Sequence, residues 1–280
     1  MKMIAVGDNV TDCYLDDGVY YPGGNAVNVA VGCARSHCFE EVAYLGIFGD
    51  DENAAHLRSC LEKEHVSLAR CRRAYAPTAQ PGVRLVSGDR QFVAGPRDSV
   101  AHLFSLALSR EDMAYIGGFD LLHTSCFSHI EEELPRLAQT LAVSFDFSDA
   151  WDEPYLRRVC PSLRYAFFSG SHLKDGQVQD LIAQCHALGT RVVGVTQGER
   201  GAVFSAAGQT YRQVPKVVAA VDTMGAGDSF IAGFLSCYST THDMEKALDF
   251  AGSCAAATVQ CHGGWGYPHP LGRGAAPASK

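Results

Sequence analysis

Residues 222–229 read Asp222-Thr223-Met224-Gly225-Ala226-Gly227-Asp228-Ser229, and they follow an apolar stretch at 217–221. We expect that stretch to be a buried strand. Apolar residues recur at helical spacing over 230–238 and predict a helix there. The quoted segment is then a strand-to-helix junction. The first backbone N–H groups of a helix have no acceptor within it and lie at the positive end of its dipole, so the junction can bind an anion.

The residue types in the junction suit phosphoryl transfer. Gly225 and Gly227 let the backbone approach the anion closely. Asp228 places a carboxylate in the first helical turn, where it could accept the proton of a hydroxyl that attacks a phosphoryl group. A purely structural explanation is also open, in which the glycines pack the helix on a sheet and Asp228 caps it. Asp is favoured at such positions, and short glycine motifs occur by chance.

A second motif lies near the other end of the chain, at residues 23–31, and reads Gly-Gly-Asn-Ala-Val-Asn-Val-Ala-Val. It follows a strand-like stretch at 3–9 and a polar loop at 10–22. Asn25 and Asn28 are three residues apart and share one face of the helix start, where their amides can bind sugar hydroxyls. Asp12, in the loop, supplies a further acceptor. Alternatively, Asn25 caps the helix and Asn28 is solvated.

Taken together, the two motifs resemble those of the ribokinase-like (PfkB) family of carbohydrate kinases, over a span from Asp8 to about Trp265. Within that family the chain is most similar to the fructoselysine 6-kinase branch, whose members phosphorylate sugar–amino acid adducts formed by glycation. The segments that carry the closer likeness are Gly7-Asp8-Asn9 with Asp12, residues 24–31, Phe145-Asp146-Phe147-Ser148-Asp149 and residues 222–234.

The order of apolar and helical stretches predicts an α/β fold. Expected strands at 41–48, 121–124, 142–147, 164–168 and 191–196 alternate with helices, one of them at about 51–63, as in a parallel sheet covered on both faces. A hairpin is expected at 202–214. The resemblance implies the same doubly wound, mostly parallel central sheet, together with a small β-sheet lid. Alternation at 83–85 and 91–93 predicts a hairpin in that lid, which we expect to include about 10–22 and 69–95. Residues 1–280 are expected to form a single domain with a frayed tail at 272–280.

Composition excludes several kinds of partner. The chain of 280 residues has 23 Lys and Arg against 31 Asp and Glu, a formal net charge of −8, and no run of basic residues. Neither nucleic acid nor an anionic membrane surface is therefore an expected partner. No apolar run is long enough for a transmembrane helix. The eleven cysteines include no C-x-x-C pair and the N-terminus lacks a signal-peptide pattern, which predicts reduced thiols and a cytoplasmic protein.

The resemblance implies direct in-line transfer from Mg-ATP to a primary hydroxyl of a small sugar, expected at C6. Asp12 and Asn28 would orient that hydroxyl, and Asp228 would remove its proton. The charge on the phosphoryl oxygens would be stabilised by backbone N–H groups of the glycine turn, which are those of Gly225, Ala226 and Gly227. The residues expected to bind the sugar are Asn9, Asp12, Gly24, Asn25, Asn28 and, from the lid, Gln80 and Arg90.

The expected nucleotide site combines the glycine turn with two other segments. Residues 196–201 follow a strand and resemble the family's segment beside the ATP phosphates, although a plain β-turn also explains them. Residues 252–257 give a small-residue helix face that borders the adenine in relatives; such residues also permit tight packing. No Walker-type G-x-x-x-x-G-K-[ST] sequence is present. The residues expected to bind ATP are Thr196, Gly198, Gly201, Thr223, Gly225, Gly227, Gly252 and Ala255.

The sequence leaves the magnesium ligands unassigned. Many family members have Asn and then Glu after the strand that ends here at Phe168, whereas this chain continues Ser169-Gly170-Ser171-His172. Asp146 either holds a metal-bound water or only ends its strand. The resemblance raises two further expectations. One is a K⁺ ion bound with help from the backbone of Asp222 and Thr223, and the other is a homodimer that forms through the lids.

Other functions with the same fold are open. The acceptor could be ribose, fructose, a fructose phosphate or a nucleoside instead of a fructose-amino acid. The loop at 9–21 holds Asp12, Asp16 and Asp17, which suit an acceptor with an amine but equally a solvated turn. The chain could also be a non-catalytic sugar-binding regulator. Asp228 within an intact glycine turn argues against that alternative.

Overall fold

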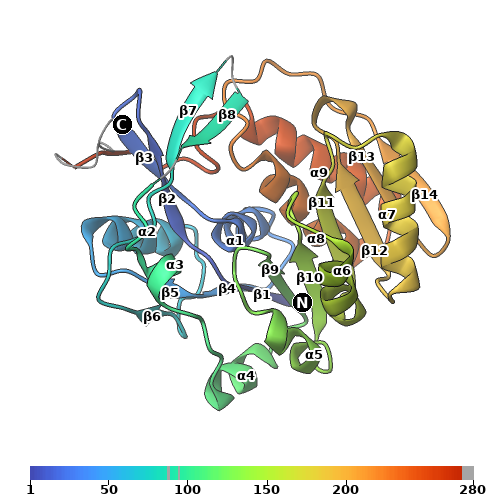
Figure 1. Ribbon diagram of the computed structural model, residues 1–280, viewed down its shortest axis with the longest axis horizontal. Coiled ribbons are helices and arrows are strands. Elements are labelled where there is room, and N and C mark those ends of the chain that lie inside the picture. Colours follow the sequence, from blue (N-terminus) through green and yellow to red (C-terminus); the bar gives the residue numbers. More distant parts are fainter. Residues whose placement is uncertain (87–88, 94, 273–280) are drawn as a thin grey trace.

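An eight-stranded sheet forms the centre of the computed structural model, which describes residues 1–86, 89–93 and 95–272 (Figure 1). Its strand order is β14-β13-β12-β11-β10-β9-β1-β4. The strands from β12 to β4 run parallel, and β13 and β14 are antiparallel at one edge. The bounds are β1 Lys2–Val6, β4 Glu41–Leu45, β9 Leu121–Ser125, β10 Ala142–Asp146, β11 Tyr165–Ser169, β12 Val192–Thr196, β13 Ala202–Ala206 and β14 Gln209–Gln213.

Helices cover both faces of this sheet because successive strand residues point to opposite sides. In β1, Met3 and Ala5 pack in the core under α1, α2, α8 and α9, whereas Ile4 and Val6 pack in the core under α4 to α7. The doubly wound, mostly parallel fold is therefore confirmed. The helices are α1 Asn25–Arg35, α2 Glu52–Lys63, α3 Val100–Leu103, α4 Arg110–Ile116, α5 Leu134–Leu137, α6 Glu153–Val159, α7 Asp175–Ala187, α8 Ala226–Thr241 and α9 Met244–Thr258, with 3-10 turns at Glu131–Glu133, Cys160–Ser162 and Gly198–Arg200.

A second, five-stranded sheet with the order β15-β3-β2-β7-β8 stands at one end of the molecule (Figure 1). Its strands are β2 Val10–Tyr14, β3 Val19–Gly23, β7 Gly82–Val86, β8 Asp89–Val93 and β15 His269–Pro270. The expected polar loop at 10–22 is thus a hairpin. The predicted lid segment 69–95 begins too early, because β6 (Arg72–Arg73) pairs outside this sheet with β5 (Ile47–Phe48). Residues 273–280 of the predicted tail lie outside the described residues.

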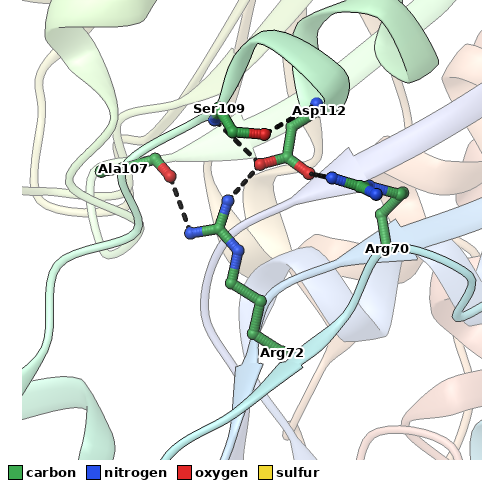
Figure 2. Close-up of polar contacts among 5 residues, drawn as sticks. All are labelled: Arg70, Arg72, Ala107, Ser109 and Asp112. Atoms are coloured by element: carbon green, nitrogen blue, oxygen red, sulfur yellow. Dashed lines mark hydrogen bonds and ion pairs between the residues drawn. The ribbon is translucent and has the colours of Figure 1, made fainter.

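A buried carboxylate fixes the chain that leads toward this small sheet (Figure 2). Asp112, in α4, has no exposed side-chain surface and pairs with Arg70, at 2.7 Å, and with Arg72. The Arg72 guanidinium also donates to the Ala107 carbonyl, and the Ser109 N–H donates to Asp112 at 2.9 Å. Burial alone would favour the neutral acid, but the Ser109 N–H and the two guanidinium groups outweigh it and lower the pKa of Asp112 to about 2. The pairs hold residues 70–72 against α4.

The predicted strand at 217–221 is wrong. Residues 214–220 have no regular structure, and Val217 is 99% exposed. Pro215 has no N–H to extend a ladder beyond β14, so the pairing ends there. The N–H groups of Val221 and Asp222 donate instead to the Val259 carbonyl, at 2.7 and 3.2 Å. The motif at 222–229 is therefore a loop-to-helix junction pinned to the end of α9.

Candidate active site

The glycine turn forms the N-terminus of α8. Gly225 is its N-cap residue with φ 71°, and a Cβ there would lie 2.7 Å from the Gly264 Cα. A side chain is thus excluded at Gly225 by conformation and by contact. Gly227 is exposed, and a Cβ there would meet nothing within 4 Å, so open space lies before the first turn. The Ala226 N–H donates to the Thr223 carbonyl at a long 3.3 Å.

Asp228 joins this turn to the second sequence motif. Its side chain is half-buried, and its Oδ1 and Oδ2 accept hydrogen bonds from Asn25 Nδ2 at 2.8 Å and Asn28 Nδ2 at 2.6 Å. Helices α1 and α8, which carry these residues, pack against each other. Asn25 and Asn28 therefore lie on one face of α1, as their spacing predicts, and that face meets the carboxylate at the start of α8.

The Asn25 amide has protein partners on both of its polar atoms. Its Nδ2 donates to Asp146 Oδ2 at 2.8 Å as well as to Asp228, and its Oδ1 lies 3.0 Å from His123 Nε2. An amide nitrogen has two hydrogens, and both are used. No Nδ2 hydrogen of Asn25 is therefore left to donate to a sugar hydroxyl, and its role as a sugar ligand stays a prediction.

The carboxylate of Asp8, 17 residues before Asn25 in the sequence, caps α1, so the alternative that the Asn25 side chain caps this helix is wrong. The N-cap residue is Gly24, with φ 109°. Asp8, just beyond the end of β1, accepts hydrogen bonds from the N–H groups of Asn25 and Ala26 at 2.8 and 3.2 Å. Burial raises the pKa of Asp8 above its usual value. This contact fixes where α1 begins and so where its two asparagines point.

Burial also sets the protonation of the groups behind Asn25. It raises the pKa of Asp146 to about 7, and the nearby charge of Asp228 acts in the same direction. It lowers the pKa of His123 to about 3, so this imidazole is neutral at physiological pH. Asp146 accepts the Ser148 N–H at 2.8 Å and ends β10. Its carboxyl titrates near neutral pH and lies one amide away from Asp228.

The other residues predicted to bind sugar surround the start of α1 and the small sheet. Asn9 is buried and donates to the Tyr44 hydroxyl and the Ile47 carbonyl, both at 2.9 Å. Asp12 is buried in β2, and a Cβ at Gly23 would lie 2.1 Å from its carboxylate. A Cβ at Gly24 would lie 2.8 Å from the Asn9 Cα. Glycine at 23 thus leaves room for the Asp12 carboxylate, and glycine at 24 leaves room for the Asn9 backbone, beside the start of α1.

Gln80 and Arg90 are the two residues of the predicted lid segment 69–95 that are expected to bind sugar. The N–H groups of Thr11 and Cys13 donate to the carbonyls on either side of Gln80, at 2.8 and 2.9 Å, so Gln80 lies beside β2. Arg90 belongs to β8, and its side chain lies outside the described part of the structure. Asp16 and Asp17 are exposed in the turn between β2 and β3.

The other segments predicted to bind nucleotide lie at the end of β12, in the turn that follows it, and on α9. Thr196 ends β12 and donates through Oγ1 to the Phe168 carbonyl at 3.2 Å. Gly198 and Gly201 have φ values of 59° and 82° in the turn that follows. On α9, Gly252 is buried where a Cβ would lie 2.4 Å from Gln213 Nε2, and Ala255 is half-buried. Gly252 thus serves close helix–strand packing.

Sequence reasoning missed Tyr14. Its hydroxyl donates to Oδ2 of the fully buried Asp222 at 2.5 Å, and that carboxylate also accepts the N–H groups of Met224, at 2.9 Å, and Gly263, at 2.8 Å. The Tyr14 contact ties the small sheet to the glycine turn. The β-branched residues Val10 and Thr11 and the aromatic Tyr14 were the signal that could have revealed the strand.

Two further features bear on the location of the site. Two surface pockets, with volumes of about 530 and 680 Å³, are lined by none of the predicted site residues. The smaller pocket is lined by Arg164 and Arg191, which lie at the N-terminal ends of β11 and β12. Asp146 and Thr196 lie at the opposite ends of the parallel strands, the carboxyl ends, where ligands bind in folds of this kind. Among the described residues, no three or more His, Cys, Asp or Glu side chains are grouped to hold a metal ion.

Comparisons with known proteins agree with this arrangement. A sequence model of the pfkB family of carbohydrate kinases matches residues 2–268. The chain is 44% identical to the fructosamine kinase FrlD of Bacillus subtilis (strain 168) over 271 residues, which cover 96% of this chain and 95% of that protein. It is 37% identical to the fructoselysine 6-kinase of Escherichia coli (strain K12), over 95% of this chain and 100% of that protein. The fold is similar to that of Arabidopsis thaliana ribokinase complexed with ribose and ATP, with a TM-score of 0.79 at 19% identity over 94% of this chain and 93% of that one.

Proposed function

The chain belongs to the pfkB family of carbohydrate kinases, and we propose that it transfers the γ-phosphoryl group of ATP to O6 of a fructose-amino acid such as fructoselysine. The observation that carries the mechanism is the Asp228 carboxylate, held by two asparagine amides beside the open first turn of α8. The high identity to kinases of fructose-amino acids over nearly the whole chain supports this acceptor.

Asp228 acts as the general base in this proposal. It accepts the proton of the attacking hydroxyl while that oxygen forms its bond to the γ-phosphorus and the bond to the leaving ADP oxygen breaks. Asp12 and Asn28 orient the sugar. The N–H groups of Gly225 and Gly227 stabilise the charge on the phosphoryl oxygens, and the Ala226 N–H joins them by giving up its long bond to Thr223.

Different groups of the protein would hold magnesium and potassium. Mg²⁺ bound with ATP would neutralise phosphate charge, and the Asp146 carboxylate, which ionises near pH 7, would hold one of its waters. A K⁺ ion beside the backbone of Asp222 and Thr223 would not use the Asp222 carboxylate, because Tyr14, Met224 and Gly263 already donate hydrogens to its oxygens. We therefore propose that any K⁺ effect is carried by backbone carbonyl groups.

We also propose a domain organisation, an oligomeric state and a location for the protein. The chain works as one domain whose small sheet closes over the sugar and excludes water from the phosphoryl group. Edge strand β8 of that sheet is the proposed contact of a homodimer, to be checked by sedimentation. The proposed location is the cytoplasm. None of the helices in the described ranges is long and apolar enough to cross a bilayer.

A substrate screen tests the function. The protein is incubated with Mg-ATP and fructoselysine, other fructose-amino acids, fructose, ribose or a nucleoside, and ADP release is followed by a coupled assay. We expect the highest kcat/KM with a fructose-amino acid, and a product whose phosphorus couples to the C6 protons in NMR spectra. A higher kcat/KM for ribose, fructose or a nucleoside would contradict the acceptor. Binding of a sugar without turnover would indicate the non-catalytic regulator.

A further inference from the structure

Each oxygen of the Asp228 carboxylate is held by an asparagine amide, and each amide has a ring nitrogen behind it. Trp265 Nε1 donates to Asn28 Oδ1 at 2.9 Å, and His123 Nε2 lies 3.0 Å from Asn25 Oδ1. The same arrangement, a ring nitrogen bonded to an asparagine amide that is bonded to a carboxylate oxygen, therefore occurs twice around Asp228. One ring belongs to His123 in β9, and the other belongs to Trp265, which follows α9.

The protonation of His123 follows from its partners. The imidazole is fully buried and neutral, so it carries one hydrogen. Asn25 Oδ1 can only accept, which assigns that hydrogen to Nε2. His123 Nδ1 then accepts from the Ser144 hydroxyl, 2.9 Å away. Ser144 and His123 thus orient the Asn25 amide with its oxygen toward the imidazole and its nitrogen toward the two carboxylates.

An asparagine amide can rotate by half a turn at little cost unless its neighbours distinguish oxygen from nitrogen. A rotated Asn28 would place its oxygen against Asp228 Oδ2, where the nitrogen now lies 2.6 Å away, and two acceptors would oppose each other. The indole N–H of Trp265 excludes that state, because a rotated amide would turn its nitrogen toward the indole N–H. A rotated Asn25 would place its oxygen against Asp146 Oδ2 and Asp228 Oδ1, and would also lose the hydrogen bond that its oxygen accepts from His123 Nε2.

We propose that His123 and Trp265 are positioning residues that fix the amides of Asn25 and Asn28, and through them the carboxylate of Asp228. Asn25 is then a positioning residue and not a ligand of the sugar. The proposal rests on the proposed function insofar as Asp228 is the base. It adds that the orientation of this base depends on two ring N–H groups outside the reacting atoms.

The substitution Trp265→Phe tests this, because it removes the N–H and keeps an aromatic ring. The matched control is Trp151→Phe. The chain has two tryptophans, and Trp151 Nε1 is buried without an acceptor in the described part of the chain. We expect Trp265→Phe to lower kcat by roughly tenfold and to shift the acid limb of the pH–kcat profile to higher pH. The pH shift follows because a rotated amide oxygen disfavours the ionised base. Trp151→Phe is expected to change none of these. A lower melting temperature of Trp265→Phe with an unchanged profile and kcat would overturn the proposal.

Two further measurements keep the test decisive. Asn25→Ser should lower kcat without raising the KM for the sugar; a raised KM at unchanged kcat would make Asn25 a sugar ligand. If Trp265→Phe does not fold, ¹H–¹⁵N spectra of the indole groups decide. Asp228→Asn should move the Trp265 signal and leave the Trp151 signal in place, and two unmoved signals would overturn the proposal. These spectra need no substrate, so they remain informative even if the substrate screen contradicts the proposed function.

Discussion

Replacing Tyr14 by phenylalanine removes one hydroxyl and leaves the fully buried Asp222 with the Met224 and Gly263 N–H groups as its donors among the residues that the structure describes. A hydrogen bond to a buried charged group contributes about 1.5–3 kcal/mol, so Tyr14→Phe should lower the free energy of unfolding by about 2 kcal/mol. For a chain of this size the corresponding fall in melting temperature is roughly 5 °C. Urea denaturation and calorimetry measure both quantities.

Tyr20→Phe is the matched control for this experiment. Tyr20 lies in β3, next to β2, and its hydroxyl is buried without a hydrogen-bond partner among the described residues. Removing an unsatisfied hydroxyl relieves a desolvation cost, so Tyr20→Phe should be neutral or stabilising by up to about 1 kcal/mol. Equal losses of stability in the two variants would refute the argument that the Tyr14–Asp222 contact holds the small sheet to the glycine turn.

Four other substitutions have outcomes that follow from the structure. The pKa of Asp112 is lowered to about 2, so its contribution to stability is present above the unfolded value near 3.8 and is lost as the pH falls through about 2. In urea titrations the stability gap between wild type and Asp112→Ala should therefore narrow below pH 4, and a constant gap would contradict the ion-pair assignment. The pKa of Asp146 is raised from 3.8 to about 7, so the stability associated with its neutral form is lost as the pH rises from about 4 to about 7, and Asp146→Asn should gain stability relative to wild type over that range. A difference in melting temperature between Asp146→Asn and wild type that does not change over this pH range would contradict the raised pKa of Asp146. Gly225→Ala should lose about 1–3 kcal/mol of stability because of its positive φ and the contact with Gly264, whereas Gly227→Ala should keep wild-type stability and lower kcat, since its methyl group faces the proposed phosphoryl position. Full activity of a well-folded Gly227→Ala protein would remove the anion site from that residue.

Buried strands of the central sheet could be predicted well from their apolar residues. The expected strands at 121–124 and 191–196 correspond to β9 and β12 within one residue at each end. Both strands are buried, and each begins with a pair of apolar residues, Leu121-Leu122 and Val192-Val193. Residues 217–221 show the limit of this signal. They are equally apolar, but nothing in a local pattern shows that the sheet ends at β14 and that Val217 faces solvent.

The site was predictable where a motif contains its own geometry and unpredictable where it depends on distant contacts. The three-residue spacing of Asn25 and Asn28 places both on one helix face, and the glycine turn places Asp228 in the first turn of α8. By contrast, His123 and Trp265 meet those asparagines from 98 and 237 residues away. A lone histidine in a strand and a tryptophan beyond the last helix carry no local sign of such a role.

Direct measurement of phosphoryl transfer by the Asp228→Asn variant tests the central claim, that this carboxylate is the base. The variant and wild type are compared with Mg-ATP and fructoselysine, or the best acceptor from the screen, and calorimetry shows that both are folded. We predict a kcat lower by roughly 10²–10⁴ with ATP binding retained. A folded Asp228→Asn protein with a kcat close to that of wild type would contradict the account.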